Sequence, residues 1–261
     1  MDKSTLGGIV VALSGIGVGL VLDGGKVAQI LQPTAALIVL GGTIGAVMVQ
    51  FPLRTVFQAL VQLKDVFLNS EPESDALVKN LLQYAYKARR EGLLSLDNEL
   101  ERIQDPFLRE SLMLAVDGVS ADDLRKMMEL QLDYQGEKNE RVAKVFEAAG
   151  GFAPTIGIIG AVLGLIQVMQ KLQDINEVGK GIAVAFVATI YGVASANLFF
   201  LPAAGKLKIR LRERQVVQEM MLEAVISIME GVNPRALELQ LGSYLPTPVA
   251  RREPSKVPVT Q

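Results

Sequence analysis

Four long stretches of the sequence carry no charged side chain, and they constrain the fold more than any other feature. They lie at residues 4–22, 27–53, 148–170 and 181–205. Crossing the hydrocarbon core of a bilayer takes roughly 20 mostly apolar residues in a helix. The 26 basic and 28 acidic residues of the chain all fall outside these stretches. The pattern predicts an all-α integral membrane protein with four transmembrane helices.

The segments between the stretches differ in positive charge. The connection after the first stretch holds Lys26, that after the third holds Lys171 and Lys180, and the remaining 23 of the 26 basic residues lie elsewhere. Cytoplasmic segments of membrane proteins hold the excess of Lys and Arg. Both termini and the segment between helices 2 and 3 are therefore predicted to be cytoplasmic.

The long polar segment has apolar residues at helical spacing and no convincing strand pattern. Glu71-Pro72 and Asp105-Pro106 are predicted breaks between its helices. We expect a helical cytoplasmic lobe there. The predicted organisation is membrane helices 1 and 2 in 1–53, the lobe in 54–147, membrane helices 3 and 4 in 148–205, a cytoplasmic helical extension in 206–242 and a flexible tail in 243–261.

The composition excludes several classes of function. The chain has no His and no Cys, so thiol chemistry, His-ligated haem and Ser-His-Asp catalysis are excluded. It has no phosphate-binding glycine loop of either common type. A net charge of −2 argues against nucleic acid as a main partner. We expect neither an enzyme nor a resident cofactor.

The predicted membrane helices are rich in small residues, which let helix backbones approach one another in lipid. Helix 3 has Gly160 and Gly164 four residues apart, and similar pairs occur in helices 1 and 2. The small or hydroxylated residues of helix 4 that share one side are Ala185, Ala188, Thr189, Gly192 and Ser195. Ordinary tight packing is one interpretation of this pattern. The other is a wall along which a partner helix moves.

Each of the last two membrane helices contains a proline, Pro154 in helix 3 and Pro202 near the inner end of helix 4. A proline inside a helix removes one backbone hydrogen bond and crowds the preceding turn. Either residue is interpreted as a static kink or as a hinge, and the sequence leaves both open.

The four stretches contain no ionisable Asp, Glu, Lys or Arg. Ion transport through a membrane commonly uses such a residue, which is costly there and therefore functional by default. If this chain conducts protons, the carboxylate that carries them must come from another polypeptide.

Several motifs in chain order make the sequence resemble flagellar-motor stator subunits of the MotA/TolQ/ExbB proton-channel superfamily. The motifs are Gly-Gly-Thr-Ile-Gly-Ala at 41–46, Ala-Arg-Arg-Glu-Gly-Leu-Leu-Ser-Leu-Asp at 88–97, Ala-Pro-Thr-Ile-Gly-Ile-Ile-Gly-Ala-Val-Leu-Gly-Leu-Ile at 153–166, Ala-Thr-Ile-Tyr-Gly at 188–192 and Glu-Gly-Val-Asn-Pro-Arg at 230–235. The resemblance runs over residues 1–242.

This resemblance implies a mechanism and a set of partners. It implies a pentameric ring of this chain in the bacterial inner membrane, around the single transmembrane helices of a MotB dimer that supplies the proton-binding Asp. Ion flow would turn or reshape the ring, and the cytoplasmic lobe would push on the rotor protein FliG.

The resemblance also implies roles for particular residues. The rotor-facing positions fall on Arg89, Arg90 and Asp97, where Glu is commoner than Asp in the family. The two functional prolines of the family match Pro154 and Pro202. The ion-pathway and helix 3–4 lining positions are Ala161, Gly164, Ala185, Ala188, Thr189 and Gly192.

The choice of ion follows from the same comparison. Sodium-driven relatives tend to carry Thr at the position of Ala161 and a Thr-Thr pair at 188–189, where this chain has Ala188 and Thr189. The resemblance therefore favours protons, with a sodium-driven PomA-like stator as an alternative. Two further alternatives are an ExbB/TolQ-type energiser, which usually has three spans, and a self-contained transporter built from two repeats, which would want a midplane charge.

Overall fold

A computed structural model describes residues 3–64 and 74–244. Every regular element in these ranges is helical, so the predicted all-α class is confirmed. The helical segments that are long and apolar enough to cross a membrane are Ser4–Leu22, Pro33–Gln50, Ala121–Gln170 and Ile175–Met229. The four predicted transmembrane helices are therefore confirmed. The predicted break at Glu71-Pro72 and residues 245–261 of the predicted tail lie outside the described residues.

The chain forms two compact units. The described residues of 1–70 and 138–210 make up the first, and those of 71–137 and 211–261 make up the second. The first unit begins with α1 (Lys3–Leu22) and the short 3-10 helix η1 (Val27–Gln29). The second span follows as three consecutive helical segments, and a short helix α4 (Leu53–Gln62) comes after it. These three segments are α2 (Pro33–Ala36), the π-helix η2 (Leu37–Gly41) and α3 (Gly42–Gln50).

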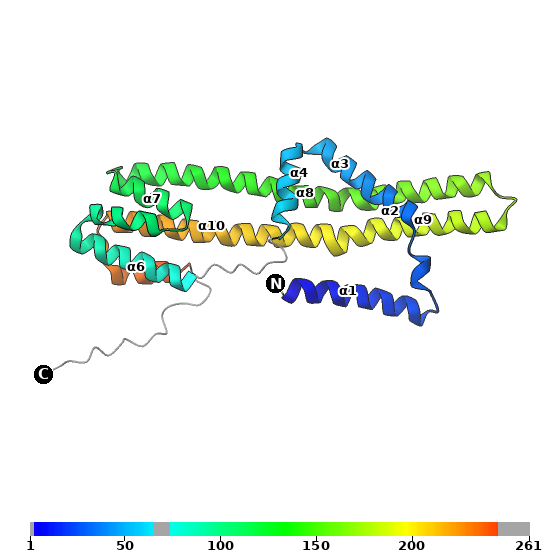
Figure 1. Ribbon diagram of the computed structural model, residues 1–261, viewed down its shortest axis with the longest axis horizontal. Coiled ribbons are helices and arrows are strands. Elements are labelled where there is room, and N and C mark those ends of the chain that lie inside the picture. Colours follow the sequence, from blue (N-terminus) through cyan, green and yellow to red (C-terminus); the bar gives the residue numbers. More distant parts are fainter. Residues whose placement is uncertain (1–2, 65–73, 245–261) are drawn as a thin grey trace. The chain divides into compact units, whose positions relative to one another are not determined.

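The last two spans belong to long helices. Helix α8 runs over Ala121–Gln170, and α9 (Ile175–Ser195) continues through the π-helix η4 (Ala196–Phe200) into α10 (Leu201–Met229). The segment boundaries predicted from the sequence at 147/148 and 205/206 lie inside α8 and α10. The helices therefore continue without a break where the charge-free stretches meet the charged segments. Figure 1 shows α8 and α9 side by side, connected by a tight turn.

The turn between α8 and α9 is built from polar residues outside the charge-free stretches. The Asp174 carboxylate accepts from the backbone N–H groups of Asn176 and Glu177 and caps α9. Glu177 in turn accepts from Lys171 at 2.6 Å and from Lys180 at 2.8 Å. The cap satisfies backbone donors that a helix start leaves unpaired, so the antiparallel pair begins from a defined point.

The second unit contains α6 (Ser74–Glu91), the 3-10 segment η3 (Leu93–Arg102), α7 (Pro106–Val116), parts of α8 and α10, and α11 (Pro234–Gly242). Their apolar faces enclose one core, whose largest fully buried side chains are Leu81, Leu96, Leu112, Leu124, Met128, Met220, Leu237 and Leu241. The predicted break at Asp105-Pro106 is confirmed. Asp105 caps α7 by accepting from the N–H groups of Phe107 and Leu108, and Pro106 occupies the first helical position.

A long-range ion pair holds two helices of the second unit together. The Arg125 guanidinium on α8 donates to both carboxylate oxygens of Glu223 on α10, at 2.5 and 3.1 Å. Paired hydrogen bonds of this kind fix orientation as well as adding energy. The two residues are 98 positions apart in the chain, so helical spacing gives no hint of the pair.

Candidate functional site

Small residues bring the backbones of α8 and α9 into direct contact. A Cβ added to Gly157 would lie 2.9 Å from the Ala188 carbonyl oxygen, and one added to Gly164 would lie 2.9 Å from the Ala185 nitrogen. A Cβ on Gly192 would lie only 2.5 Å from the Ala153 carbonyl oxygen. These positions need glycine because the atoms that a side chain would meet are backbone atoms.

The structure places the six predicted lining residues in two groups. Gly164, Ala185, Ala188 and Gly192 are buried in the contact between α8 and α9. Ala161 and Thr189 are only partly buried. Because the first group is buried inside the subunit, its residues pack the two helices together. The sequence alone could not distinguish this packing role from the lining of an ion pathway. The assignment of all six to an ion pathway stays a prediction.

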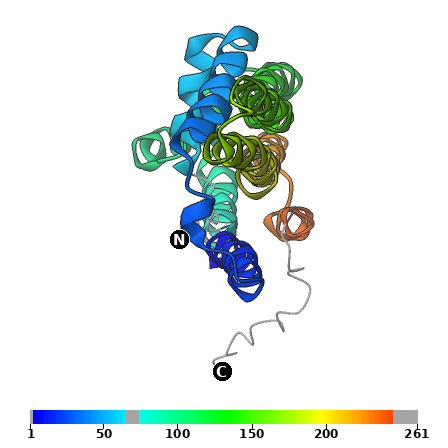
Figure 2. The ribbon, with the colours of Figure 1, turned by 90° about the vertical axis from the view of Figure 1, so that its right-hand side faces the viewer.

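The second span packs against the same helix pair. Ala35 and Val39 are fully buried and form a small cluster with Val187 and Ala188 of α9. Gly42 completes the contact, since a Cβ there would lie 2.7 Å from the Ile156 side chain on α8. Figure 2 shows this span in blue next to the α8–α9 pair, which is viewed end-on. Three of the four spans therefore share one interface.

The glycine pairs of the first two spans behave differently. Gly15 and Gly19 in α1, and Gly41 and Gly45 in the second span, have no other part of the described chain within 4 Å of an added Cβ. No other described residue therefore packs against these glycines. Tight packing within one subunit does not explain them.

Tyr191 connects α9 to the approach of the second span. Its hydroxyl donates to the Ile30 carbonyl at 2.7 Å and accepts from the Gln32 backbone N–H at 3.3 Å. Gln32 precedes the first helical residue of α2, Pro33, which cannot donate a hydrogen bond. One side chain thus satisfies two backbone groups where the chain enters the second span. In the sequence Tyr191 is only one member of the motif at 188–192, because its partners lie 161 and 159 positions away in the chain.

The two prolines sit in different local settings. Pro154 lies inside the continuous helix α8 and is half-buried, so the Gly150 carbonyl loses its usual helical donor. Pro202 is exposed and follows the π-helix η4, whose end is marked by the Leu201 N–H donating to the Ala196 carbonyl five residues back. A π-turn before a proline widens the helix where the missing N–H would have bonded.

The polar side chains of the last span bond to their own helix. Thr189 Oγ1 donates to the Ala185 carbonyl at 3.3 Å, Ser195 Oγ to the Gly192 carbonyl at 3.2 Å, and Asn197 Nδ2 to the Val193 carbonyl at 2.9 Å. Each hydroxyl donor, and one of the two amide donors of Asn197, is satisfied within the same helix, as a membrane favours. The hydroxyl oxygens of Thr189 and Ser195, both half-buried, can still accept hydrogen bonds.

Three charged residues of the second unit lie around one glycine turn. Arg89 and Arg90 lie in the last turn of α6, and Asp97 lies in η3, with Gly92 between them at a φ of 84°. This left-handed conformation favours glycine and lets the chain reverse. All three charged side chains are exposed, and none forms an ion pair or hydrogen bond with the described residues.

The turn is fixed from both sides. Leu96 is completely buried in the core, and the Lys87 ammonium donates to the Glu99 carboxylate at 2.5 Å. The hydrogen bond from Lys87 and the nearby Arg102 hold the pKa of Glu99 below its usual range. Burial, together with the charge of Glu99, raises the pKa of Tyr84. The exposed charges are thus presented on a rigid support.

Comparisons with known proteins agree along the length of the chain. The model of the MotA/TolQ/ExbB proton channel family matches residues 99–220, and that of the Motility protein A N-terminal region matches residues 6–92. Motility protein A of Bacillus subtilis is 36% identical over 247 residues, which cover 94% of this chain and 92% of that protein. The chain belongs to the MotA/TolQ/ExbB proton channel family. Within it the chain is a flagellar stator protein of the MotA type and not an enzyme.

Two solved structures carry the same fold. The chain from the structure of C. jejuni MotAB superimposes with a TM-score of 0.89 at 34% identity, and that from the flagellar MotAB stator complex of Bacillus subtilis with 0.86 at 36%. Each covers 94% of this chain, and this chain covers 96% of each. The four membrane spans and the helical unit described above are therefore the MotA-type stator fold.

Proposed function

We propose that this chain forms the channel wall and the torque-generating arm of a flagellar stator driven by protons. Two observations together carry the proposal: the chain belongs to an ion channel family, and its four charge-free stretches contain no Asp, Glu, Lys or Arg. A channel of this kind needs a titrating group within the bilayer. A MotB-like single-span subunit carrying an intramembrane Asp would supply it, and the two solved relatives are MotAB complexes.

The proposed assembly is a pentameric ring of this chain around the helices of a MotB-like dimer. The uncovered glycine faces of α1 and the second span support contacts between neighbouring copies, since glycine pairs let helices approach closely. Among the lining positions, Ala161 and Thr189 are the partly exposed ones and so the two best placed to face a partner helix. The buried set, which includes Gly164 and Gly192, would keep the wall rigid.

The proposed orientation follows the distribution of basic residues. Both termini, the lobe at 54–147 and the extension at 206–242 would be cytoplasmic in the bacterial inner membrane, with two short loops outside. Arg89, Arg90 and Asp97 would then contact the rotor protein FliG, because they are exposed charges on a support fixed by buried residues. Complementary charge steers and orients such contacts more than it strengthens them.

The prolines would act where the chain bends. Pro154 lies near the start of the third charge-free stretch, and Pro202 lies near the end of the fourth. Neither proline can donate the helical hydrogen bond to the carbonyl four residues before it. We assign them the role of permitting a change in helix curvature when the partner Asp takes up or loses a proton. The ion is assigned as a proton because Ala161 and Ala188 offer no hydroxyl ligand at the two positions discussed above.

The test is complementation in a motile bacterium whose own stator genes have been deleted. The chain is expressed with a MotB-like single-span protein, and swimming speed is measured as sodium is replaced by potassium. The proposal expects swimming that persists without sodium and stops when a protonophore dissipates the proton gradient. Swimming that requires sodium would contradict the assignment of the ion. A failure of the two proteins to purify together would contradict the assembly.

A further inference from the structure

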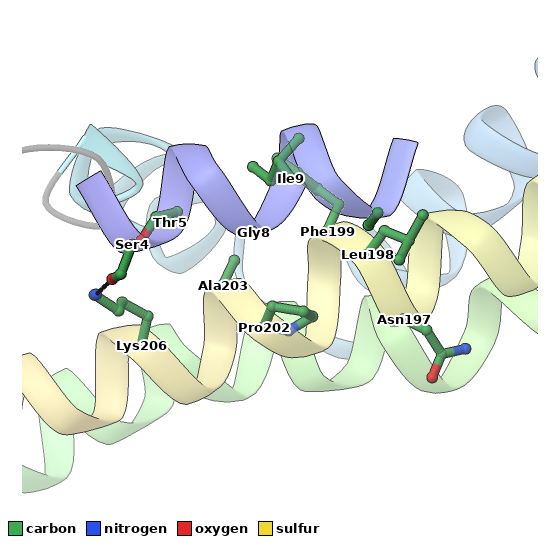
Figure 3. A pocket seen from close by; sticks show the side chains of 11 residues that line it. Ser4, Thr5, Gly8, Ile9, Asn197, Leu198, Phe199, Pro202, Ala203 and Lys206 are labelled. Atoms are coloured by element: carbon green, nitrogen blue, oxygen red, sulfur yellow. Dashed lines mark hydrogen bonds between the residues drawn. The ribbon is translucent and has the colours of Figure 1, made fainter. Parts of the chain in front are cut away.

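A cavity of about 390 Å³ lies between α1 and the end of the last membrane span. Its volume lies within the range of roughly 300–1,000 Å³ typical of ligand pockets. Most of its lining is apolar, and the principal apolar residues are Gly8, Ile9, Ala12, Phe199, Pro202 and Ala203. Figure 3 shows the two helices that face each other across it. Small residues on α1 and the proline after the π-turn leave this space unfilled.

One end of the cavity is polar and cationic. The Lys206 ammonium donates to the Ser4 hydroxyl at 3.4 Å, and Thr5 lies beside this bond (Figure 3). Ser4 begins the first charge-free stretch and Lys206 follows the last one directly. Both residues therefore lie at the same boundary of the membrane, at the depth of lipid headgroups.

We propose that the cavity binds one acyl chain of an anionic phospholipid, with the lipid phosphate beside Lys206. The apolar lining matches a hydrocarbon chain, and the cation at its polar end matches a phosphate. A neutral lipid would fill the apolar part but gain nothing from Lys206. The cavity shares Pro202 with the residues assigned above to a change in helix curvature, so its occupancy would make the stator sensitive to the lipid composition of the leaflet that it faces.

The chain has no tryptophan, so a single introduced one is the only tryptophan that this chain contributes to the signal. Phe199→Trp places the fluorophore in the lining, and the same preparation without this change supplies the background. The full chain is reconstituted with its single-span partner in vesicles of neutral lipid that contain a small fraction of brominated phosphatidylglycerol or brominated phosphatidylcholine. Bromine quenches tryptophan only at short range.

The proposal expects brominated phosphatidylglycerol to quench at about a fivefold lower fraction than brominated phosphatidylcholine, the preference that one Lys near an anionic surface supports. Lys206→Gln should abolish the preference and Lys206→Arg should keep it. Gly8→Leu should weaken quenching by filling the cavity. Gly7→Leu is the matched control, because neither glycine has other atoms near an added Cβ and only Gly8 lines the cavity.

Several outcomes would overturn the proposal. Equal quenching by the two lipids would show that the cavity has no preference for an anionic lipid. No quenching by either lipid would show that another protein segment covers the cavity. Loss of the preference on adding inorganic phosphate would leave a phosphate site without an acyl chain. An equal effect of Gly7→Leu and Gly8→Leu would place the effect outside the cavity. Co-purification with the partner checks that each variant assembles.

Discussion

Gly192 of α9 lies against Ala153 of α8 so closely that an added Cβ would be 2.5 Å from the Ala153 carbonyl oxygen. Neither helix can move away cheaply, because Gly157 and Gly164 make similar contacts along the same seam. The two helices are therefore tightly packed along this seam. This packing would couple a change in the curvature of one helix to the other.

Replacing Gly192 by alanine should destabilise this seam. We expect Gly192→Ala to cost about 1–3 kcal/mol, the usual cost of adding a methyl group to a well-packed interface, and to lower the thermal unfolding midpoint of the purified complex. Gly151→Ala on α8 is the control, since nothing lies within 4 Å of its added Cβ. Equal midpoints for the two variants would contradict the close contact.

Removing the Tyr191 hydroxyl should loosen the second span. Tyr191→Phe leaves the Ile30 carbonyl and the Gln32 N–H without this partner, and we expect a loss of about 1–3 kcal/mol in stability. Tyr134→Phe is the matched control because that side chain is 71% exposed. Thermal unfolding of the two variants in one detergent compares them directly. An unchanged midpoint for Tyr191→Phe would show that the hydroxyl bonds contribute nothing net.

Reversing the charge at Arg89 should impair torque without dismantling the stator. Arg89→Glu keeps the fold, because the side chain is exposed and makes no ion pair or hydrogen bond within the described residues. Lys79→Glu makes the same change elsewhere on α6, at another exposed position. We expect slow or absent swimming for the first variant and normal swimming for the second, with both still recruiting the partner. Normal swimming of Arg89→Glu would remove Arg89 from the rotor contact.

The Lys87–Glu99 ion pair gives the second unit a pH dependence of known sign. Since the pKa of folded Glu99 is lowered, with its hydrogen bond from Lys87 the largest cause, the pair stabilises above the unfolded value of about 4.3. That contribution disappears as the pH falls through the lower folded value. Glu99→Gln should therefore lower the unfolding midpoint at neutral pH, and the difference from the parent should shrink in acid. A difference that grows in acid would have the wrong sign.

Charge and hydropathy were enough to predict the membrane part of this fold. A helix in lipid satisfies the hydrogen bonds of its own backbone, so a helix was the expected structure for each charge-free stretch. The four spans between Ser4 and Lys206 were predicted on this basis. The continuous course of α8 was not predicted. Helices can run on from lipid into water without a break when, as at Glu147, the sequence changes polarity but offers no cap.

The packing of the small residues was less predictable. Every span has small residues at helical spacing, and only the three-dimensional arrangement separates Gly157, which meets α9, from Gly15, which meets nothing in the described chain. The same holds for pairs far apart in sequence, such as Arg125 with Glu223. Local periodicity describes one helix face and carries no information about which other face covers it. The positions of the exposed charges at Arg89 and Asp97 came from the family motif and not from periodicity.

Proton flux through reconstituted vesicles tests the central claim most directly. The chain is incorporated alone or together with its single-span partner, and internal pH is followed after a membrane potential is imposed. Because the charge-free stretches hold no Asp, Glu, Lys or Arg, the account predicts no flux from the chain alone, flux from the pair, and none when the intramembrane Asp of the partner is replaced by Asn. Robust flux from vesicles that contain this chain alone would contradict it.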